Sequence, residues 1–515
     1  IIFDPTNNGT ATINGDIDLG GLTSIFNIAD GSSFVDMNIT SIINNGGINK
    51  TGAGLLQLLG ANTYTNGTTI TAGTLQGNTT SLQGNIIDNA NLIFEQSSDG
   101  TFNGTLSGTG TMLKKGMAML TFSNANTLDG LTTVDQGTLS INGTYGGAGL
   151  LLVNPSGRLQ GTGTISKNST IFGTLAAGNS VGTLHFVGSQ VLATGSTLEV
   201  EVNPATIDLI DITGDLTIQN GSSLHLIPAA AIYPDDFIYQ IIGTTGGVTG
   251  TFSSVTSTLP LFQPLVVYTP NDVFLKGSFL PFISIFNKGN AEQVAKCLDS
   301  MSLTGECDIR NIILQLQFLP TVEDLTEAIL QFQPSAFTSL AIAQEDSMLY
   351  VKNTIFDHSH LRPCNNSSLQ NCNNLWIFPF MGFTKQNSSH QEPGFRANTY
   401  GFFAGLDHSF SEEFMVGTGV GYGYTKFNWK MNRGKAKTHN LYGSLYSTYE
   451  RGNGFIQAAI IGGYSKYHID RHIEFGSSFF QGETVIDRHA KSNHHGLEAS
   501  LNAYGALDYS YSQLN

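Results

Sequence analysis

Charge is scarce in this sequence, and basic charge most of all. Only 12% of the 515 residues are Asp, Glu, Lys or Arg, whereas an average soluble protein has about 25%. Lys and Arg number 23 against 39 Asp and Glu, which gives a formal net charge of −16. A chain this acidic repels the phosphate backbone that nucleic-acid-binding proteins must neutralise. The composition therefore argues against a nucleic-acid partner.

Long apolar runs are also lacking. No stretch of 18 consecutive apolar residues occurs, so the sequence predicts no transmembrane helix. The chain opens at Ile1 in strand-like sequence without a signal peptide, and we expect its front to be missing. A hydrophobic content of 40% is nevertheless enough to form real cores, and the length suggests about three domains.

The composition changes near residue 276. Residues 1–275 contain 5 basic and 18 acidic residues together with 39 of the 60 glycines, whereas residues 276–515 contain 18 basic and 21 acidic residues. The first region is poor in charged residues and rich in turn-forming residues. The sequence therefore predicts two regions of different character.

An internal repeat organises the first region. Residues 50–75 (KTGAGLLQLLGANTYTNGTTITAGTL) align without gaps on residues 114–139 (KKGMAMLTFSNANTLDGLTTVDQGTL), and 11 of the 26 positions are identical. Inside each copy, short runs alternate apolar and polar residues between Gly, Asn and Asp, which is typical of short strands joined by turns. Repeats too small to bury their own apolar face gain stability by stacking, so the pattern predicts a right-handed parallel β-helix with about 20 residues per coil. A β-sandwich is the alternative.

These residues resemble a known family. The segment at 50–75 resembles the passenger-associated transport repeat of bacterial autotransporters, the type V secretion proteins. GTLAAGNSVGTLHFVG at 173–188 and GGVTGTF at 246–252 resemble the late passenger region of that family, which is thought to act as a folding template. The resemblance implies a β-helix passenger over residues 1–149 and a late, autochaperone-like β-helix over residues 150–277.

Helical periodicity replaces the strand pattern between residues 288 and 360. Helices are expected over 290–298, 308–316 and 321–332, where Thr321 follows a proline and precedes acidic residues as a helix N-terminus prefers. A further helical stretch, 335–355, extends to Ser359. The resemblance implies a short α-helical linker over residues 278–375, whose last helix, about residues 340–360, threads the pore of a barrel.

A strict alternation begins at residue 376 and is clearest in MVGTGVGYGY at 415–424, where four glycines share one face. Long alternating strands joined by short turns and longer polar loops are typical of an antiparallel transmembrane β-barrel, with one face toward lipid and the other toward the lumen. Six strands are expected, at about 376–383, 399–410, 414–428, 439–450, 454–468 and 494–511.

Six strands cannot close such a barrel. A barrel needs at least about eight strands, because an unpaired edge in lipid leaves backbone groups without hydrogen bonds, and the family that the sequence resembles has twelve. We therefore expect an all-β protein in which residues 376–515 are the N-terminal part of an outer-membrane barrel, and both ends of the chain to be truncated.

One motif suggests hydrolase chemistry. Residues 178–182, GNSVG, fit the pattern of a nucleophile elbow, in which a sharp turn from strand to helix exposes a serine. No helix follows here, because Thr183 to Val187 continue as a strand, and the pentapeptide belongs to the passenger pattern. His185 would lie along that same strand instead of facing Ser180. We therefore expect no catalytic residues.

Four cysteines remain to be explained. In an oxidising periplasm the natural pairs are Cys297 with Cys307 and Cys364 with Cys372, each closing a small loop. Cysteine in the linker is less common in the family, so the pairing stays open and free thiols remain an alternative.

A second alternative for the last two cysteines is zinc. His358, His360, Cys364 and Cys372 have metal-ligand side chains, but their spacing does not match the usual zinc patterns. We expect no metal site.

Together these observations predict an outer-membrane autotransporter that exports and displays its own β-helical passenger on the cell surface, for adhesion or self-association. Outer-membrane lipid, a host or neighbouring cell surface, the barrel-assembly machinery and periplasmic chaperones are the expected partners. We expect no cofactor and no enzymatic activity. The alternative is an autotransporter with an esterase or protease passenger that lies largely outside these residues.

Overall fold

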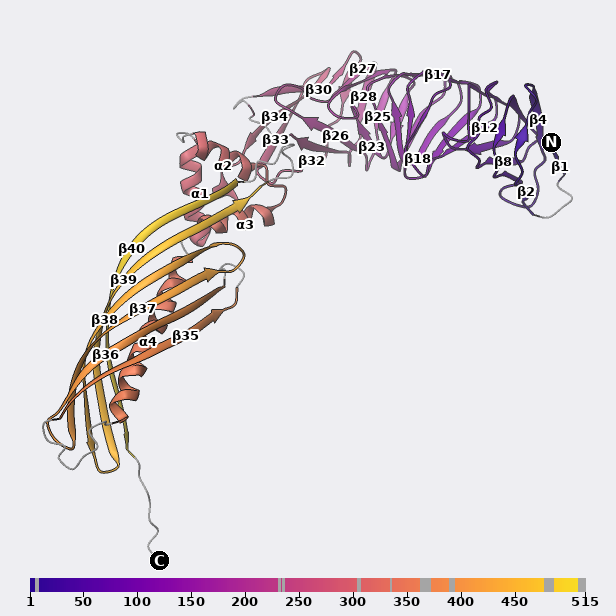
Figure 1. The fold of residues 1–515 in the computed structure, drawn as a ribbon. Coiled ribbons are helices and arrows are strands. Elements are labelled where there is room, and N and C mark those ends of the chain that lie inside the picture. The colour runs from indigo at the N-terminus through magenta and orange to yellow at the C-terminus, as the bar shows by residue number, and fades with distance from the viewer. Residues whose placement is uncertain are drawn as a thin grey trace, which may run out of the picture. The chain divides into compact units, whose positions relative to one another are not determined.

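The computed structural model describes residues 1–4, 9–229, 233, 237–302, 307–333, 336–361, 372–388, 394–476 and 486–507. These residues form two compact units, 1–281 and 282–515, both drawn in Figure 1. Each unit is described by itself. Among the described helices, none combines the length and the apolar character that crossing a membrane would require.

The first unit is a parallel β-helix made of short strands. One sheet contains, in spatial order, β1 (Ile2–Phe3), β4 (Thr23–Ile28), β7 (Gly47–Thr51), β9 (Thr68–Ile70), β11 (Ile86–Asp88), β14 (Leu106–Gly108), β17 (Ala125–Leu128), β19 (Thr144–Gly146), β21 (Thr164–Ser166), β24 (Thr183–Val187), β27 (Leu209–Thr213), β30 (Ile238–Thr244), β34 (Asp272–Phe279) and β33 (Phe262–Tyr268). Only the last two are antiparallel to their neighbours, as a hairpin at the end of the sheet.

The other faces of the β-helix come from the strands in between. In chain order they are β2 (Ala11–Ile13), β5 (Met37–Ile39), β8 (Leu55–Leu58), β10 (Thr74–Gly77), β12 (Asn91–Glu95), β13 (Gly100–Phe102), β15 (Thr111–Lys115), β16 (Met119–Phe122), β18 (Thr132–Ile141), β20 (Leu151–Gln160), β22 (Ser169–Ile171), β23 (Thr174–Ala176), β25 (Gln190–Leu192), β26 (Thr197–Val202), β28 (Asp215–Ile218), β29 (Ser223–Pro228), β31 (Gly247–Thr249) and β32 (Ser254–Ser257), with a small side pair of β3 (Ile17–Asp18) and β6 (Ile43–Asn44).

The register of these strands confirms the predicted coil. Leu92 lies opposite Met112, 20 residues further along, and Leu120 lies opposite Leu139, 19 residues further along. Because stacked coils keep this register, like side chains lie above one another inside the helix. One such ladder, buried throughout, consists of Leu120, Leu139, Leu159, Leu175, Leu198 and Leu224. Burial of this ladder is what the short strands gain by stacking.

A buried lysine explains part of the repeat. Lys50 is fully buried, and its Nζ donates hydrogen bonds to the carbonyls of Thr51, Gly52 and Ala72 at 3.0, 2.8 and 3.1 Å. Lys114, 64 residues later, is also fully buried and bonds the equivalent carbonyls of residues 115, 116 and 136 at 3.0, 2.7 and 2.9 Å. Each ammonium group thus ties the turn of one coil to the turn of the next.

A buried asparagine explains another repeated position. Asn62 accepts a hydrogen bond from the backbone N–H of Ile43 at 2.8 Å, and Asn126 accepts one from Leu106 at 2.7 Å. Both side chains are at least 95% buried. Each therefore satisfies a backbone donor of the preceding coil that would otherwise be buried without a partner.

The second unit contains helices followed by one antiparallel sheet. The helical elements are η1 (Phe282–Ser284), α1 (Gly289–Ser302), α2 (Cys307–Gln317), α3 (Val322–Phe332) and α4 (Ala336–Leu361). Thr321 caps α3, since its side chain accepts a hydrogen bond from the N–H of Asp324 at 3.0 Å. The predicted start of this helix is confirmed.

Six strands form the sheet, each paired with the next in the chain. They are β35 (Cys372–Gln386), β36 (Phe395–Ser409), β37 (Phe414–Trp429), β38 (Gly434–Arg451), β39 (Gly454–Phe475) and β40 (Ile486–Leu507). All six predicted strands are present, and most are longer than expected. The sheet is strongly curved in Figure 1, as part of a barrel would be, which agrees with the predicted fold class.

The two faces of the sheet differ as the alternation predicts. In β37, Gly417, Gly419, Gly421 and Gly423 lie on the buried face. The opposite face carries large apolar side chains that are at least 38% exposed, namely Leu375, Ile377, Met381, Phe383, Tyr400, Phe402, Leu406, Val420, Leu441, Leu445, Ile456, Ile460, Leu497 and Leu501. An apolar outer face and a polar or glycine-rich inner face are the pattern of a membrane barrel.

Removing one rung of the leucine ladder should destabilise the first unit. Leu159→Ala is expected to lower the free energy of unfolding by about 2–5 kcal/mol, because the fixed coils above and below prevent the cavity from closing. Leu150→Ala, at a position 39% exposed, is the matched control and should change it by less than about 0.5 kcal/mol. Urea unfolding followed by far-UV circular dichroism measures both, and equal effects would contradict the ladder.

Stability of the first unit should also depend on pH. Burial lowers the pKa of Lys50 and Lys114 from 10.5 to about 8. Between pH 8 and 10.5 the unfolded chain therefore binds more protons than the folded chain, and the free energy of unfolding should rise with pH. The double variant Lys50→Met and Lys114→Met should show a smaller rise.

The control for this pH dependence is Lys115→Met, the neighbour of Lys114 on the same strand, which should keep the wild-type slope. Both tryptophans of the chain, Trp376 and Trp429, lie in the second unit. Tryptophan fluorescence therefore reports separately whether that unit remains folded. A slope that is the same in all three proteins would show that the buried lysines do not titrate in this range.

Candidate functional site

Helix α4 lies along the inner face of the curved sheet (Figure 1). Glycine makes room for it. A Cβ atom at Gly382 of β35 would lie 2.0 Å from the ring of Tyr350 on α4. Other helix residues, among them Met348, Val351, Ile355 and Phe356, are buried against aromatic side chains of the sheet. The inward glycines of β37 make room for rings of the sheet instead, because a Cβ atom at Gly417 or Gly419 would lie 2.3 or 2.4 Å from the ring of Tyr446 or Phe403.

A buried polar network holds the C-terminal end of α4. His358 donates from Nε2 to Asp407 Oδ2 at 2.6 Å, and both side chains are almost fully buried. The same carboxylate accepts hydrogen bonds from Trp376 Nε1 at 3.1 Å, from Asn374 at 3.3 Å and from the Tyr446 hydroxyl. The rings of His358 and Trp376 stack with centroids 4.1 Å apart. One helix side chain is thus fixed by three strands.

The four hydrogen bonds that Asp407 accepts limit what its carboxylate can do chemically. A carboxylate has about four lone-pair positions, and four donors already occupy those of Asp407. No position is left on the carboxylate to act on a substrate. The network therefore positions α4, and its interior location protects the hydrogen bonds from competing water.

Further polar contacts fix the helix along its length. Ser339 accepts a hydrogen bond from Trp429 Nε1 at 2.9 Å, Gln344 donates to Ser465 at 2.8 Å, and Ser347 shares one with Tyr442 at 2.6 Å. Gln457 of β39 bonds the carbonyl of Phe356 at 3.2 Å. Because these contacts span nearly five helical turns, the helix can lie against the sheet in only one register.

Ser180 and His185 are not brought together as a catalytic pair. Both are exposed, and no hydrogen bond joins them among the described residues. His185 instead pairs with Asp211 of the next coil at 2.9 Å. The turn containing Ser180 is held by the buried Asp208, which accepts from the N–H of Gly182 at 2.9 Å. The motif therefore lies in a turn between strands of the β-helix.

The cysteines give a mixed result. Cys297 on α1 is an exposed, free thiol, so the predicted bond to Cys307 is not formed, and the side chain of Cys307 lies outside the described residues. Cys372 is disulfide-bonded. Its predicted partner, Cys364, lies outside the described residues, and this pairing stays a prediction.

The two histidines of the alternative zinc cluster have different partners, while Cys364 lies outside the described residues. His358 is engaged by Asp407, whereas the ring of His360 packs edge-on against Phe455 at 4.5 Å. The two imidazole rings therefore contact side chains of different strands, β36 and β39.

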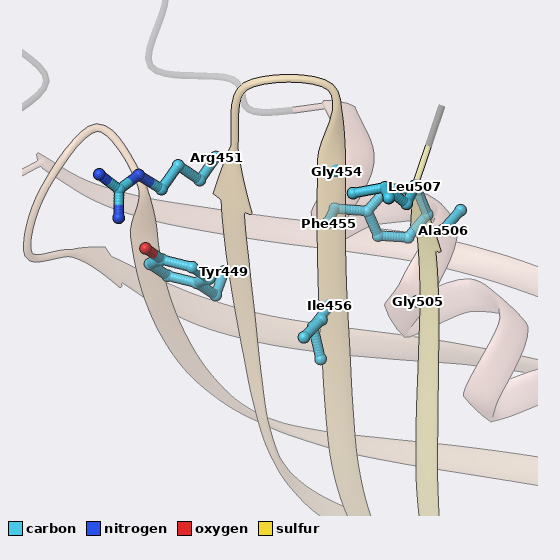
Figure 2. A pocket seen from close by; sticks show the side chains of 8 residues that line it. All are labelled: Tyr449, Arg451, Gly454, Phe455, Ile456, Gly505, Ala506 and Leu507. Carbon is cyan, nitrogen blue, oxygen red and sulfur yellow. The ribbon is translucent and has the colours of Figure 1, made fainter. Parts of the chain in front are cut away.

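A hollow of about 370 Å³ lies at the end of strands β38, β39 and β40. Figure 2 shows Phe455 directed toward Ala506 and Leu507, while Tyr449 and Arg451 come from the neighbouring strand. Its lining is mainly apolar and lies at the edge of the sheet. Among the lining side chains, the polar groups are the Tyr449 hydroxyl, which donates to Glu413 at 3.2 Å, and the Arg451 guanidinium.

A parallel β-helix combined with a curved sheet that is apolar outside and packed on a helix inside defines an outer-membrane protein with a passenger. Comparison with known proteins agrees. Residues 375–514 match the family described as autotransporter beta-domain, and residues 48–76 and 105–141 match the passenger-associated-transport-repeat family. The chain therefore carries the two hallmark segments of autotransporters, which confirms the resemblance seen in its sequence. The beta-domain places the barrel in the outer membrane and the passenger outside the cell.

Curated relatives carry two kinds of name. An "Extracellular serine protease" of Serratia marcescens is 24% identical over 426 residues, which cover 72% of this chain and 40% of the relative. A second protein of that name and organism is 23% identical over 370 residues, covering 61% and 35%. The "Adhesin BmaC autotransporter" of Brucella suis biovar 1 (strain 1330) is 32% identical over 194 residues, covering 32% and 6%. The chain thus spans less than half of each relative.

The expectation that this protein is not an enzyme is wrong in the light of these relatives. Two of the three are named serine proteases and match most of this chain. The expectation was based on the GNSVG turn alone. The surroundings of one serine do not decide whether a whole passenger has enzymatic activity.

Removing the central carboxylate should loosen the helix. Asp407→Ala leaves the buried donors of His358, Trp376 and Tyr446 without their acceptor, and should lower the free energy of unfolding of the second unit by about 3–5 kcal/mol. His408→Ala, which affects only a half-buried contact to Asn373, is the control. Tryptophan fluorescence of the purified protein during urea unfolding in detergent measures both, and a similar midpoint for the two variants would argue against the network.

Proposed function

We propose that this autotransporter displays its β-helix for adhesion to, or self-association between, cells. Export of a passenger is supported by the beta-domain and the transport repeats, and one relative is named an adhesin. The observation that carries the finer proposal is the outer surface of the β-helix, where uncharged polar side chains form rows from coil to coil. Thr71 donates to Asn49 at 2.9 Å and Thr111 donates to Asn91 at 3.0 Å.

Such rows suit contact between copies. Their donors and acceptors are held in place by the neighbouring coil, so little side-chain entropy is lost when a second surface docks. The net charge of residues 1–275 is 5 − 18 = −13. Association should therefore strengthen when salt screens the repulsion.

The export step itself requires partners outside the chain. We propose contact of the apolar sheet face with outer-membrane lipid, and assembly by the barrel-assembly machinery after transfer by periplasmic chaperones. The low charge of the passenger favours passage through a narrow lumen, and stacking of each exported coil on the coils already folded provides a driving force without nucleotide.

Surface display can be tested on intact cells. Protease treatment should remove the epitopes of residues 1–275 and leave a protected fragment that begins near residue 336, because α4 is packed on the inner face of a sheet that lies within the membrane. The same treatment of lysed cells is the control for protease activity. A passenger that is cut only after lysis would contradict display.

Self-association predicts settling of cells in still culture. Settling should be faster at 0.15 M than at 0.01 M salt, and it should be slowed severalfold by Thr71→Glu with Thr111→Glu, which place like charges in the polar rows. Thr206→Glu, in an exposed turn away from the rows, is the control. Equal settling of all variants at equal surface level would contradict a role of these rows.

A serine-protease passenger is the second candidate, favoured by the names of two relatives. It predicts that exported protein hydrolyses casein and is labelled covalently by a fluorophosphonate probe. Ser180→Ala shows whether Ser180 is the labelled residue. Lack of labelling and of hydrolysis by the exported protein would remove this candidate, whereas labelling retained in the variant would place the nucleophile elsewhere.

A further inference from the structure

Strands β39 and β40 each contain the sequence Ile-Asp-Arg-His, at residues 469–472 and 486–489. The antiparallel register places His472 directly opposite His489. Because side chains alternate between faces, Asp470, His472, Asp487 and His489 share the outer face of the sheet. The two arginines point to the inner face, where Arg471 bonds the carbonyl of Gln333 at 2.7 Å and Arg488 pairs with Asp308 of α2.

The two histidines and Asp487 converge on one point. His472 Nε2 lies 2.9 Å from Asp487 Oδ1, and His489 Nε2 lies 3.9 Å from the same oxygen. The two rings are stacked with centroids 4.6 Å apart, and one potential ligand atom from each of the three residues lies within 4.8 Å of the others. His472 is only 8% exposed, so this position is fixed by packing.

The second nitrogen of each ring is already used. His472 Nδ1 lies 2.8 Å from the carbonyl of Asn432, and His489 Nδ1 lies 2.9 Å from Asp470 Oδ1. Both partners are acceptors only, so each Nδ1 carries the proton. In the neutral rings, both Nε2 lone pairs then face the Asp487 carboxylate. Lone pairs of three atoms that face one point repel one another, so a positive charge is required between them.

We propose that His472, Asp487 and His489 form a site for a divalent transition-metal ion such as Zn²⁺. In a tetrahedral site with bonds of about 2.0–2.1 Å, the ligand atoms lie about 3.3 Å apart, between the two separations observed here. Ring N–H groups held by a carboxylate and a carbonyl are the usual outer support of metal-binding histidines. Three protein ligands leave a fourth position for water.

The proposed site would fasten the outer end of the sheet. Glu474, two residues beyond His472, exchanges two backbone hydrogen bonds of 2.8 Å with the side chain of Gln331 on α3. A metal ion across β39 and β40 would therefore hold the strand end on which α3 rests. A metal-free imidazolium of His472 paired with Asp487 is the competing arrangement, and the experiment separates the two.

The test uses the full chain, purified in detergent and stripped with a chelator, with Cys297→Ser as background so that the free thiol binds no metal. Calorimetric titration with Zn²⁺ and the visible spectrum of added Co²⁺ are the measurements. We expect one site with a tetrahedral Co²⁺ spectrum, and at least tenfold weaker Zn²⁺ binding in His472→Gln, His489→Gln and Asp487→Asn.

Two further variants sharpen the result. Asp470→Ala removes the outer support of His489, together with an exposed ion pair to Lys435 at 3.9 Å, and should weaken binding by about 10-fold or more. His495→Gln, an outward histidine of β40 that bonds Tyr464 at 2.6 Å, should bind like the parent protein. An octahedral Co²⁺ spectrum, or Zn²⁺ affinity that is the same in the parent and in the three ligand variants, would overturn the proposal. Far-UV circular dichroism of each variant checks that the sheet is folded.

Discussion

Every structural level of this protein depends on one requirement, the pairing of backbone hydrogen-bonding groups between strands. In the β-helix, apart from the terminal hairpin of β33 and β34, the partner is the next coil, commonly about 20 residues along the chain, as Leu92 opposite Met112 illustrates. In the curved sheet the partner is the adjacent antiparallel strand, and in lipid no water could replace it. Both units therefore put their strands into fixed register, and register in turn decides which side chains stack.

The fixed register also determines the role of the few basic residues in the β-helix. Of the five basic residues before residue 276, Lys50, Lys114 and Lys167 are buried and donate to backbone carbonyls at the turns. In the β-helix, buried lysine side chains thus donate hydrogen bonds to turn carbonyls that the strand pairing does not satisfy. The second unit uses the same principle for a different purpose, because Asp407 collects donors from several strands to hold one helix.

The sequence could reveal whatever repeats locally. Alternation over Met415 to Tyr424 predicts which face of β37 is buried, and the 64-residue period predicts stacked coils. It could not reveal that Lys50 is buried, because a lysine is normally solvated and one of its three acceptors, the carbonyl of Ala72, lies in the turn of the next coil. Nor could it reveal the pairing of His358 with Asp407, since 49 positions and strand β35 separate them. A comparison of the two Ile-Asp-Arg-His segments would have been the one signal for the outer cluster.

Alternation also explains how one tetrapeptide serves two purposes. A strand that presents its arginine inward must present the residues on either side of it outward. Arg471 and Arg488 therefore bind the helical region, while the aspartates and histidines beside them meet on the opposite face. Because the strands are antiparallel, the two copies face each other with His472 opposite His489, and each histidine reaches the aspartate of the other copy. The reciprocal pairing follows from register and alternation alone, so a shift of one residue would separate both pairs.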